Sequence, residues 1–161
     1  MPTRRLSALA VETHKRRPFD SPEQEAHLSV LRTASVLEAP FAELFRGAGL
    51  SGPTYNVLRI LRGAGPGGRA CHEIAEHMVT RVPDVTRLLD RLESRGLVAR
   101  TREMADRRVV TARITPAGLA RLAALDRSTL DLHARLLGHL TRAELRTLTG
   151  LLAKARRPPG E

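Results

Sequence analysis

The sequence has no tryptophan and a single tyrosine. Sites for single-stranded nucleic acid depend on exposed aromatic rings on which the bases stack, so this composition disfavours such a site. A single cysteine excludes a framework of intrachain disulfides, which agrees with a reducing compartment. No apolar run approaches the roughly 18 residues that a membrane-spanning helix needs, and the first residues lack the apolar core of a signal peptide. We therefore expect a cytoplasmic protein with no membrane partner.

Two patterns associated with enzymes are incomplete. Residues 63–68 formally match the glycine spacing of a dinucleotide-binding loop, but they follow an expected helix rather than a strand, and Pro66 interrupts them. His72 and His77 resemble a zinc-hydrolase pair, yet their spacing of five places them on different sides of a helix. The other histidines form no ligand cluster, and no nucleophile stands near a base. We expect no metal site, no cofactor and no enzymatic activity.

The charge of the chain is strongly one-sided. Lysine and arginine number 27 against 17 acidic residues, which gives a formal charge of +10 and an isoelectric point of about 11.4. Such a surface concentrates near phosphate or anionic lipid, so a polyanionic partner is indicated. A basic chain that binds no nucleic acid specifically is the alternative that charge alone leaves open.

Residues 81–113 carry the most specific pattern. Apolar residues recur there at helical spacing, namely Val85, Leu88, Leu89 and Leu92. Gly96 is suited to end this helix because glycine enters the left-handed conformation of a C-terminal cap without steric cost. Residues 97–102 and 108–114 are short, rich in Val, Thr and Ile, and therefore indicate a two-stranded hairpin. The stretch has nine arginines against five acidic residues, and a basic helix followed by a basic hairpin suits double-stranded DNA.

Two further helices are expected before this stretch, over residues 54–62 and residues 70–79. On the apolar side of the second of these helices, Cys71 is interpreted as a buried structural cysteine rather than a redox sensor. The short turn over residues 79–82 joins that helix to the basic one, which makes a helix-turn-helix. Pro83 is expected at the first helical position, where a missing amide has no cost.

The N-terminal half of the basic helix is the part that meets base edges in this kind of docking. The candidates for contact with DNA are Arg81, Pro83, Asp84, Thr86, Arg87 and Arg91. Arg87 is suited to donate two bonds to guanine; a phosphate contact or an ion pair with Asp84 or Asp90 is the alternative. Thr86 suits a base edge or a thymine methyl, whereas Arg91 is expected to hold phosphate or to pair with an acid of the helix.

The turn of the hairpin holds Asp106, Arg107 and Arg108. An acid beside an arginine anchors that side chain, so Asp106 is expected to orient the tip rather than to contact DNA. One of the two arginines is then free to enter a narrow minor groove, where the negative potential is strongest. A solvated tip is the alternative in the absence of DNA.

The N-terminal part is expected to combine a basic arm with a long helix. Residues 1–20 form the arm, which either contacts phosphate or a partner subunit or is a solvated tail. Ser21 and Gln24 fit a capping box, and the proline that follows Ser21 suits the first position of a helix. This helix belongs to residues 21–50, and Pro40 should kink or break it.

The C-terminal part is rich in leucine. Thr115 and Pro116 are suited to open a helix, and Thr141 with Glu144 forms a full capping box for the last one. The leucines are too numerous for a small winged module to cover, so we interpret the surplus as a homodimer interface; simple core packing is the alternative. The candidate interface residues are Leu137, Leu145, Leu148 and Leu152.

Several of these motifs, in this order, resemble the MarR family of bacterial winged-helix regulators. They are YNVLRIL (55–61), EIA (73–75), VTRLLDRLE (85–93), RGLV (95–98), DRR (106–108), and then Ile114, Thr115 and Gly118. The resemblance covers residues 18–152. It implies a homodimer formed by the terminal helices and a pseudo-palindromic operator. It also implies repression or, less often, activation of nearby genes, commonly relieved by a small-molecule effector bound between the lobes.

The fold class that we expect is mainly α, with a winged helix-turn-helix lobe, whose wing is a small β-hairpin, and a helical dimerisation lobe. The expected segments are the arm 1–20, the N-terminal dimerisation helix 21–50, the winged lobe 51–115, the C-terminal dimerisation helices 116–157 and a tail 158–161. The expected function is that of a sequence-specific, ligand-responsive, homodimeric repressor that binds double-stranded DNA. The alternative is an architectural protein that binds DNA without base preference and without an effector.

Overall fold

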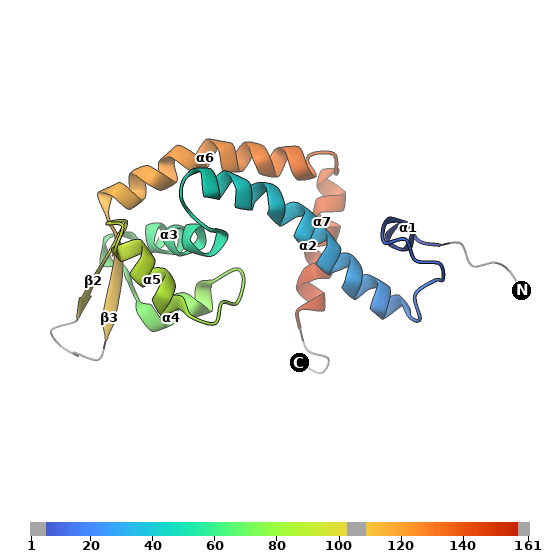
Figure 1. Cartoon of the computed structure of the whole chain (residues 1–161), viewed down its shortest axis with the longest axis horizontal. Helices are drawn as coiled ribbons and strands as arrows, with labels where there is room; N and C mark the ends of the chain where they lie inside the picture. Colours follow the sequence, from blue (N-terminus) through green and yellow to red (C-terminus); the bar gives the residue numbers. More distant parts are fainter. Residues whose placement is uncertain (1–5, 103–108, 158–161) are drawn as a thin grey trace, which may run out of the picture. The chain divides into compact units, whose positions relative to one another are not determined.

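The computed structural model describes residues 6–102 and 109–157. Most of this structure is helical, as the sequence predicts, and the described strands form one small sheet (Figure 1). The elements are α1 (Ala8–Glu12), α2 (Pro22–Gly47), α3 (Gly52–Ala64), the 3-10 helix η1 (Gly65–Gly67), β1 (Arg69–Ala70), α4 (Cys71–His77), α5 (Val85–Glu93), β2 (Val98–Arg102), β3 (Val110–Ile114), α6 (Pro116–Leu137) and α7 (Arg142–Ala155). They fall into two compact units, residues 1–43 and residues 44–161. None of the helices in the described ranges is long and apolar enough to cross a membrane.

The first unit contains α1 and most of α2. Ser7 caps α1, because its side chain accepts a hydrogen bond from the backbone of Ala10. Leu9, Ala10 and Phe19 form a buried cluster, and the ammonium group of Lys15 lies 4.9 Å from the centre of the Phe19 ring. The described part of the basic arm is therefore folded, which differs from the alternative of a solvated tail.

The start of α2 confirms one half of the predicted capping box. The Ser21 hydroxyl accepts a hydrogen bond from the backbone of Gln24 at 3.1 Å, as expected. The side-chain oxygen of Gln24, however, accepts from the backbone of Asp20 at 2.9 Å instead of from that of Ser21. From Pro22 the helix continues to Gly47, so Pro40 does not break it, and of the two predicted effects only a kink stays a prediction; a proline removes one helical hydrogen bond, and the neighbouring turns continue without it.

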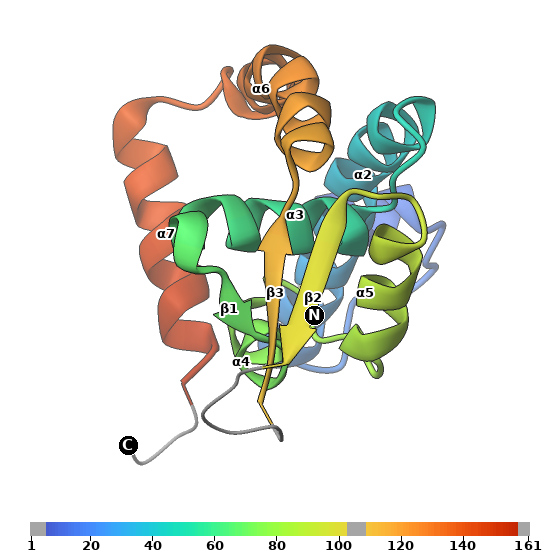
Figure 2. The same cartoon turned by 90° about the vertical axis from the view of Figure 1, so that its left-hand side faces the viewer.

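The second unit is organised around α3, which contacts α4, α5, α6 and β3 (Figure 2). The helix starts at Gly52, slightly earlier than predicted, because Ser51 and Thr54 form a capping box at its N-terminus. Its apolar side and the facing helices supply side chains that are almost wholly buried, namely Val57, Leu58, Leu61, Ile74, Leu89, Leu92 and Leu122. Burial of this kind is the main stabilising contribution, and it fixes α5 against α3.

The sheet has three antiparallel strands in the order β1-β3-β2. The predicted hairpin is confirmed as β2 and β3, whose register pairs Val98 with Ile114. The two-residue strand β1 was not predicted; it adds to the free edge of β3 by pairing Arg69 with Ala112. Gly68, with φ of +72°, makes this approach possible, since a Cβ there would lie 2.4 Å from the carbonyl oxygen of Ala112. The glycine-rich segment 63–68 thus allows the residues that follow it to pair with the sheet as β1.

The two C-terminal helices begin at the predicted caps. Thr115 accepts a hydrogen bond from the backbone of Gly118 at 3.1 Å, and Thr141 and Glu144 exchange the bonds of a full capping box. No residue of α7 is buried. Of the predicted interface leucines, Leu148 is 39% exposed, and the remaining three, Leu137, Leu145 and Leu152, are half-buried.

Candidate nucleic-acid interface

Asp84 sets the start of α5, the predicted basic helix, which we call the recognition helix because its N-terminal half is predicted to meet base edges. We expected Pro83 at the first helical position, but the helix begins at Val85 with Asp84 as its N-cap, so that prediction is wrong. The side chain of Asp84 accepts a hydrogen bond from the backbone of Arg87 at 3.0 Å. Aspartate is a favoured N-cap because its carboxylate satisfies a free amide, and here this preference outweighs the fit of proline at the first position. Asp84 therefore has a structural role in the recognition helix.

One side of α5 is buried and the other is exposed. Leu89 and Leu92 retain 1% and 0% of their surface, whereas the predicted contact residues Arg81, Pro83, Thr86, Arg87 and Arg91 are all exposed. Arg87 and Arg91 are four residues apart and lie on the same side of the helix. Among the described residues, no carboxylate forms an ion pair with either guanidinium group. The ion pair of Arg87 with Asp84 or Asp90, which we gave as an alternative, is therefore not formed among the described residues.

The turn between α4 and α5 is held from α3. The side-chain oxygen of Asn56 accepts a hydrogen bond from the backbone of Val79 at 2.8 Å. Val79 itself is 86% exposed. This contact fixes the start of the helix-turn-helix turn relative to the core, and the sequence reading missed it because Asn56 lies 23 residues away.

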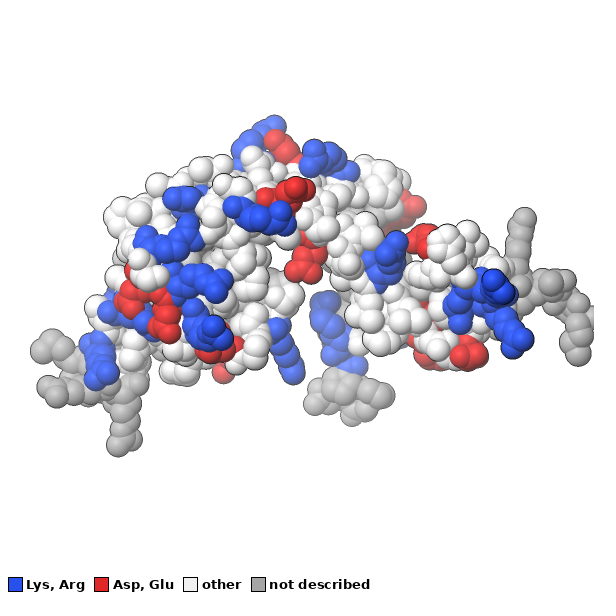
Figure 3. All heavy atoms as spheres, in the orientation of Figure 1, with Lys and Arg blue, Asp and Glu red and all other residues white. Residues whose placement is uncertain are grey.

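The acidic residues of α5 belong to a network with the wing. Arg100 on β2 bonds to Glu93 through its backbone nitrogen at 3.0 Å and through Nε at 2.9 Å, and its Nη2 lies 2.6 Å from both Glu93 and Asp90. These bonds hold the pKa of Glu93 below its usual range. In Figure 3, blue side chains gather with red ones among them over the part of the molecule that contains α5 and β2. The sequence reading did not single out Arg100.

The exit from α5 is fixed by the first turn of α6. Gly96 has φ of +67°, and the amides of Gly96 and Leu97 return to Glu93 and Leu92, which confirms the predicted glycine cap. The Thr115 hydroxyl donates to the carbonyl of Gly96 at 2.7 Å, and the backbone of Thr115 donates to that of Leu97 at 3.1 Å. The C-terminal end of the recognition helix is thus bonded to the residue that caps α6.

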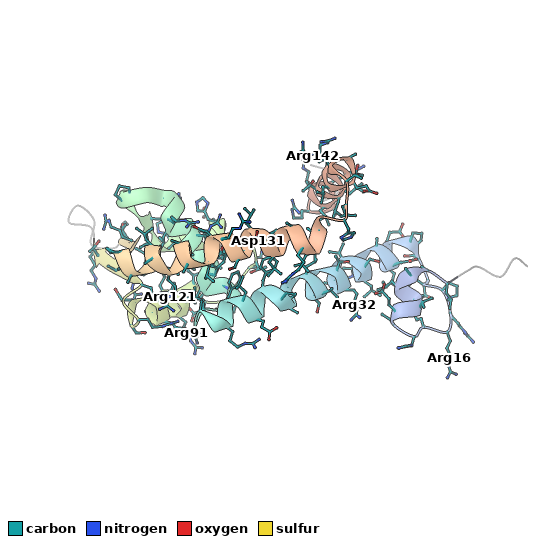
Figure 4. All side chains as sticks on the ribbon, turned by 90° about the horizontal axis from the view of Figure 1, so that it is seen from above. Arg16, Arg32, Arg91, Arg121, Asp131 and Arg142 are labelled. Atoms are coloured by element: carbon teal, nitrogen blue, oxygen red, sulfur yellow. The ribbon has the colours of Figure 1, made fainter. Side chains whose placement is uncertain are left out.

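Two arginines attach the corner between α2 and α3 to these same helices. Arg95, just after α5, donates to the carbonyl oxygen of Gly49. Arg121 on α6, which is labelled in Figure 4, donates to the carbonyl oxygen of Ala48 at 2.7 Å. The carbonyls at the end of a helix lack intrahelical partners, so guanidinium donors are favourable there. The recognition helix, the α2–α3 corner and α6 are therefore joined to one another by hydrogen bonds.

The predicted tip of the wing, Asp106, Arg107 and Arg108, lies outside the described residues. The described strands lead up to it, and on them Arg102 is exposed. Arg113 is engaged within the sheet region, since its Nη1 donates to the Thr101 hydroxyl at 2.6 Å and its Nε to the carbonyl of Pro66 at 3.3 Å.

Cys71 and His77 lie at the start and at the end of α4. Cys71 is half-buried rather than buried as predicted; the burial that it has raises the pKa of the thiol, which disfavours the reactive thiolate. The ring nitrogen Nε2 of His77 lies 2.7 Å from a guanidinium nitrogen of Arg69. The described part of the chain contains no group of three His, Cys, Asp or Glu side chains placed to hold a metal ion.

Comparisons with known proteins match this architecture. A family model described as "MarR family" matches residues 50–110. The crystal structure of a MarR transcription factor from Planctomyces limnophilus is 44% identical, with 84% of this chain and 98% of that chain covered and a TM-score of 0.66. The structure of the transcriptional repressor CouR bound to a 23-mer DNA duplex is 30% identical, with 80% and 90% covered and a TM-score of 0.71.

A relative from Bacillus subtilis (strain 168), the HTH-type transcriptional repressor MdtR, is 35% identical over 82 residues. This alignment covers 51% of the present chain and 53% of that repressor, so the chain matches about half the length of this curated relative.

Proposed function

The chain belongs to the MarR family of transcriptional regulators, and we propose that it is a homodimer that binds double-stranded DNA at a specific, pseudo-palindromic operator. The observation that carries this proposal is the exposed side of α5. Arg87 and Arg91 project from it without a carboxylate partner among the described residues, while the opposite side is buried in the core. Free guanidinium groups on a rigid helix are suited to phosphates and to guanine edges.

In the proposed complex, α5 enters the major groove with its N-terminal half toward the bases. Thr86 and Arg87 would contact base edges, and Arg81 and Arg91 would contact the flanking phosphates. Arg107 or Arg108 of the wing would reach the adjacent minor groove. The similarity to CouR, which was crystallised with a 23-mer duplex, supports this type of ligand for the chain.

A second copy of the chain would complete the site. Two recognition helices read half-sites about 34–36 Å apart, which requires a fixed distance between subunits. The leucines of α7 are available for such an interface, because no residue of that helix is buried within the chain. Leu148 and Leu151 are 39% and 61% exposed, an unfavourable arrangement for an isolated subunit.

The proposed regulatory role is repression in the cytoplasm, relieved by a small-molecule effector. The similarity to MdtR and CouR, both named repressors, supports the direction of regulation. An effector would act by favouring a dimer geometry whose recognition helices no longer match the spacing of the operator. This role is one of binding and not of catalysis.

Selection of fragments from the source genome, followed by competition against random DNA at physiological salt, tests the proposal. A sequence-specific regulator should prefer its selected site by a factor of roughly 10³ or more. A ratio near one with a steep dependence on salt would instead indicate an architectural DNA-binding protein. Genes beside the selected fragments would then supply compounds to screen as effectors.

A further inference from the structure

The recognition helix carries two carboxylates beside the arginines that we assign to DNA. Arg87 and Asp90 are three residues apart, and side chains at this spacing are neighbours on a helix surface. An ion pair between them would occupy the guanidinium group that has to reach a base. Asp90 and Glu93 would also face the phosphates of a bound duplex with uncompensated negative charge.

In the structure, Arg100 binds both carboxylates, which opposes an ion pair between Asp90 and Arg87 and compensates the negative charge of Asp90 and Glu93. One Nη2 atom lies 2.6 Å from Asp90 Oδ1 and 2.6 Å from Glu93 Oε2, so a single guanidinium group engages both carboxylates. A third and a fourth bond, from Nε and from the backbone nitrogen, attach β2 to Glu93. With Asp90 engaged in this way, Arg87 has no carboxylate partner among the described residues.

We propose that Arg100 is a positioning residue for DNA recognition, which keeps Arg87 free for the duplex by holding Asp90 and Glu93. This inference rests on the proposed function and adds a residue that is not itself assigned to DNA. Arg100 is half-buried, with 23% of its side chain exposed, and its Nε and Nη2 atoms donate to the two carboxylates.

The geometry requires arginine and not merely a positive charge. The planar guanidinium group presents Nε and Nη2 to Glu93 and uses the same Nη2 for Asp90. Lysine has one compact ammonium group on a flexible stem and lacks this fork. Arg100→Lys should therefore give an intermediate effect. The side-chain bonds from Arg100 also lower the pKa of Glu93, because they favour the charged form of this carboxylate.

The test is a double-mutant cycle on the full-length protein, with the ratio of affinities for selected and random DNA as the readout. Arg100→Gln should lower this ratio by about three- to fivefold, since Asp90 is then released to form an exposed ion pair with Arg87 in each of the two half-sites. In an Arg87→Ala background, the same substitution should change the ratio by less than about twofold, because there is no Arg87 left to protect. Equal effects of Arg100→Gln in both backgrounds would overturn the inference.

A rescue variant separates this role from a general loss of structure. Asp90→Asn added to Arg100→Gln removes the competitor for Arg87 without rebuilding any ion pair. It should restore most of the lost ratio, and failure to do so would also overturn the inference. Arg62→Gln is the matched control, since it breaks another arginine-carboxylate pair, with Asp126, that joins α3 to α6. It should lower the melting temperature and leave the ratio unchanged.

The proposed function and this inference fail in different ways. A ratio near one for the unaltered protein contradicts the proposed function. A high ratio for the unaltered protein that Arg100→Gln leaves intact contradicts only the role of Arg100. If Arg100→Gln does not fold, Arg100→Lys with and without Asp90→Asn gives the same comparison.

Discussion

Arginines on and beside α5 have the same chemistry but different surroundings. The guanidinium group of Arg95 donates to the carbonyl of Gly49, and that of Arg100 is bound to Asp90 and Glu93. Arg87 and Arg91 are exposed and free of carboxylates within the described residues. Availability rather than charge therefore distinguishes the side chains assigned to DNA from those that hold the fold.

Arg87→Ala should weaken binding to the preferred site more than binding to random DNA. The loss of one bidentate contact with a base is expected to cost about 1–3 kcal/mol in discrimination per half-site. Arg91→Ala is the comparison, because a phosphate contact contributes equally to all sequences and its loss should reduce the salt slope by about one. Titrations of both variants at several salt concentrations measure the two effects. Equal losses on both DNAs for Arg87→Ala would contradict its role in base reading.

The pair between Arg62 and Asp126 predicts a dependence of stability on pH. Side-chain bonds from Arg62 lower the pKa of Asp126, so this carboxylate stabilises the fold above its ordinary pKa of about 3.9. The contribution is lost as the pH falls through the lower folded value. Because the two side chains are 31% and 45% exposed, solvent screening limits it to about 1 kcal/mol or less. In urea unfolding, Asp126→Asn should be less stable than the unaltered protein at pH 7, and the difference should shrink as the pH falls below about 3.9; a constant difference would contradict this assignment.

Regular patterns in the sequence predicted the helices and the hairpin. The leucine spacing and Gly96 placed α5 and its exit, and Thr115 and Thr141 placed the starts of α6 and α7. These features depend on neighbours in the sequence. The start of α5 was misplaced because Pro83 and Asp84 compete for adjacent roles and the aspartate cap prevails.

Features that depend on distant partners could not be predicted in the same way. The strand β1 has two residues and is defined only by its pairing with β3. Asn56 and Arg100 look like ordinary polar residues until the fold brings them to Val79 and to α5. One signal was present, since two carboxylates on a helix that we assign to DNA imply a nearby cation. The sequence does not say which of the many arginines supplies it.

Gly118→Ala should destabilise the protein although alanine is the better helix former. A Cβ at this position would lie 2.3 Å from the carbonyl oxygen of Leu97 and 2.7 Å from a side-chain carbon of Ile114. The backbone of Leu97 also bonds to Thr115, so it cannot yield freely. We expect a net loss of about 1–3 kcal/mol from overpacking, measured by denaturant unfolding.

Gly63→Ala is the control for this prediction. It lies in α3 with nothing within 4 Å of the added atom, so helix propensity should act alone. The expected result is a gain of up to about 1 kcal/mol. If both variants are stabilised, the start of α6 is less tightly packed on the exit of α5 than the contacts indicate.

The bonds around Gly96 and the α2–α3 corner indicate how a dimer would control DNA binding. Thr115 and Arg121 connect α6 to the end of α5 and to Ala48. Because α6 is bonded to the end of α5, a movement of α6 would move the recognition helix with it. In the proposed homodimer, a change in the relative position of the two α6 helices would therefore change the spacing of the reading surfaces.

Leu148→Asp tests whether that homodimer uses α7. The side chain is 39% exposed in the single chain, so an aspartate is tolerated there by a monomer. In an interface it would be a buried, unpaired charge, whose cost of several kcal/mol should convert the dimer to a monomer at micromolar concentration.

The control is Arg146→Asp, which introduces the same residue about 200° around the helix and should leave the dimer intact. Light scattering measures the mass of each variant. Titration of a full operator should show that Leu148→Asp binds with an affinity lower by about 100-fold or more, because each monomer engages one half-site without a linked second one. A mass that stays dimeric for Leu148→Asp would place the interface on another surface.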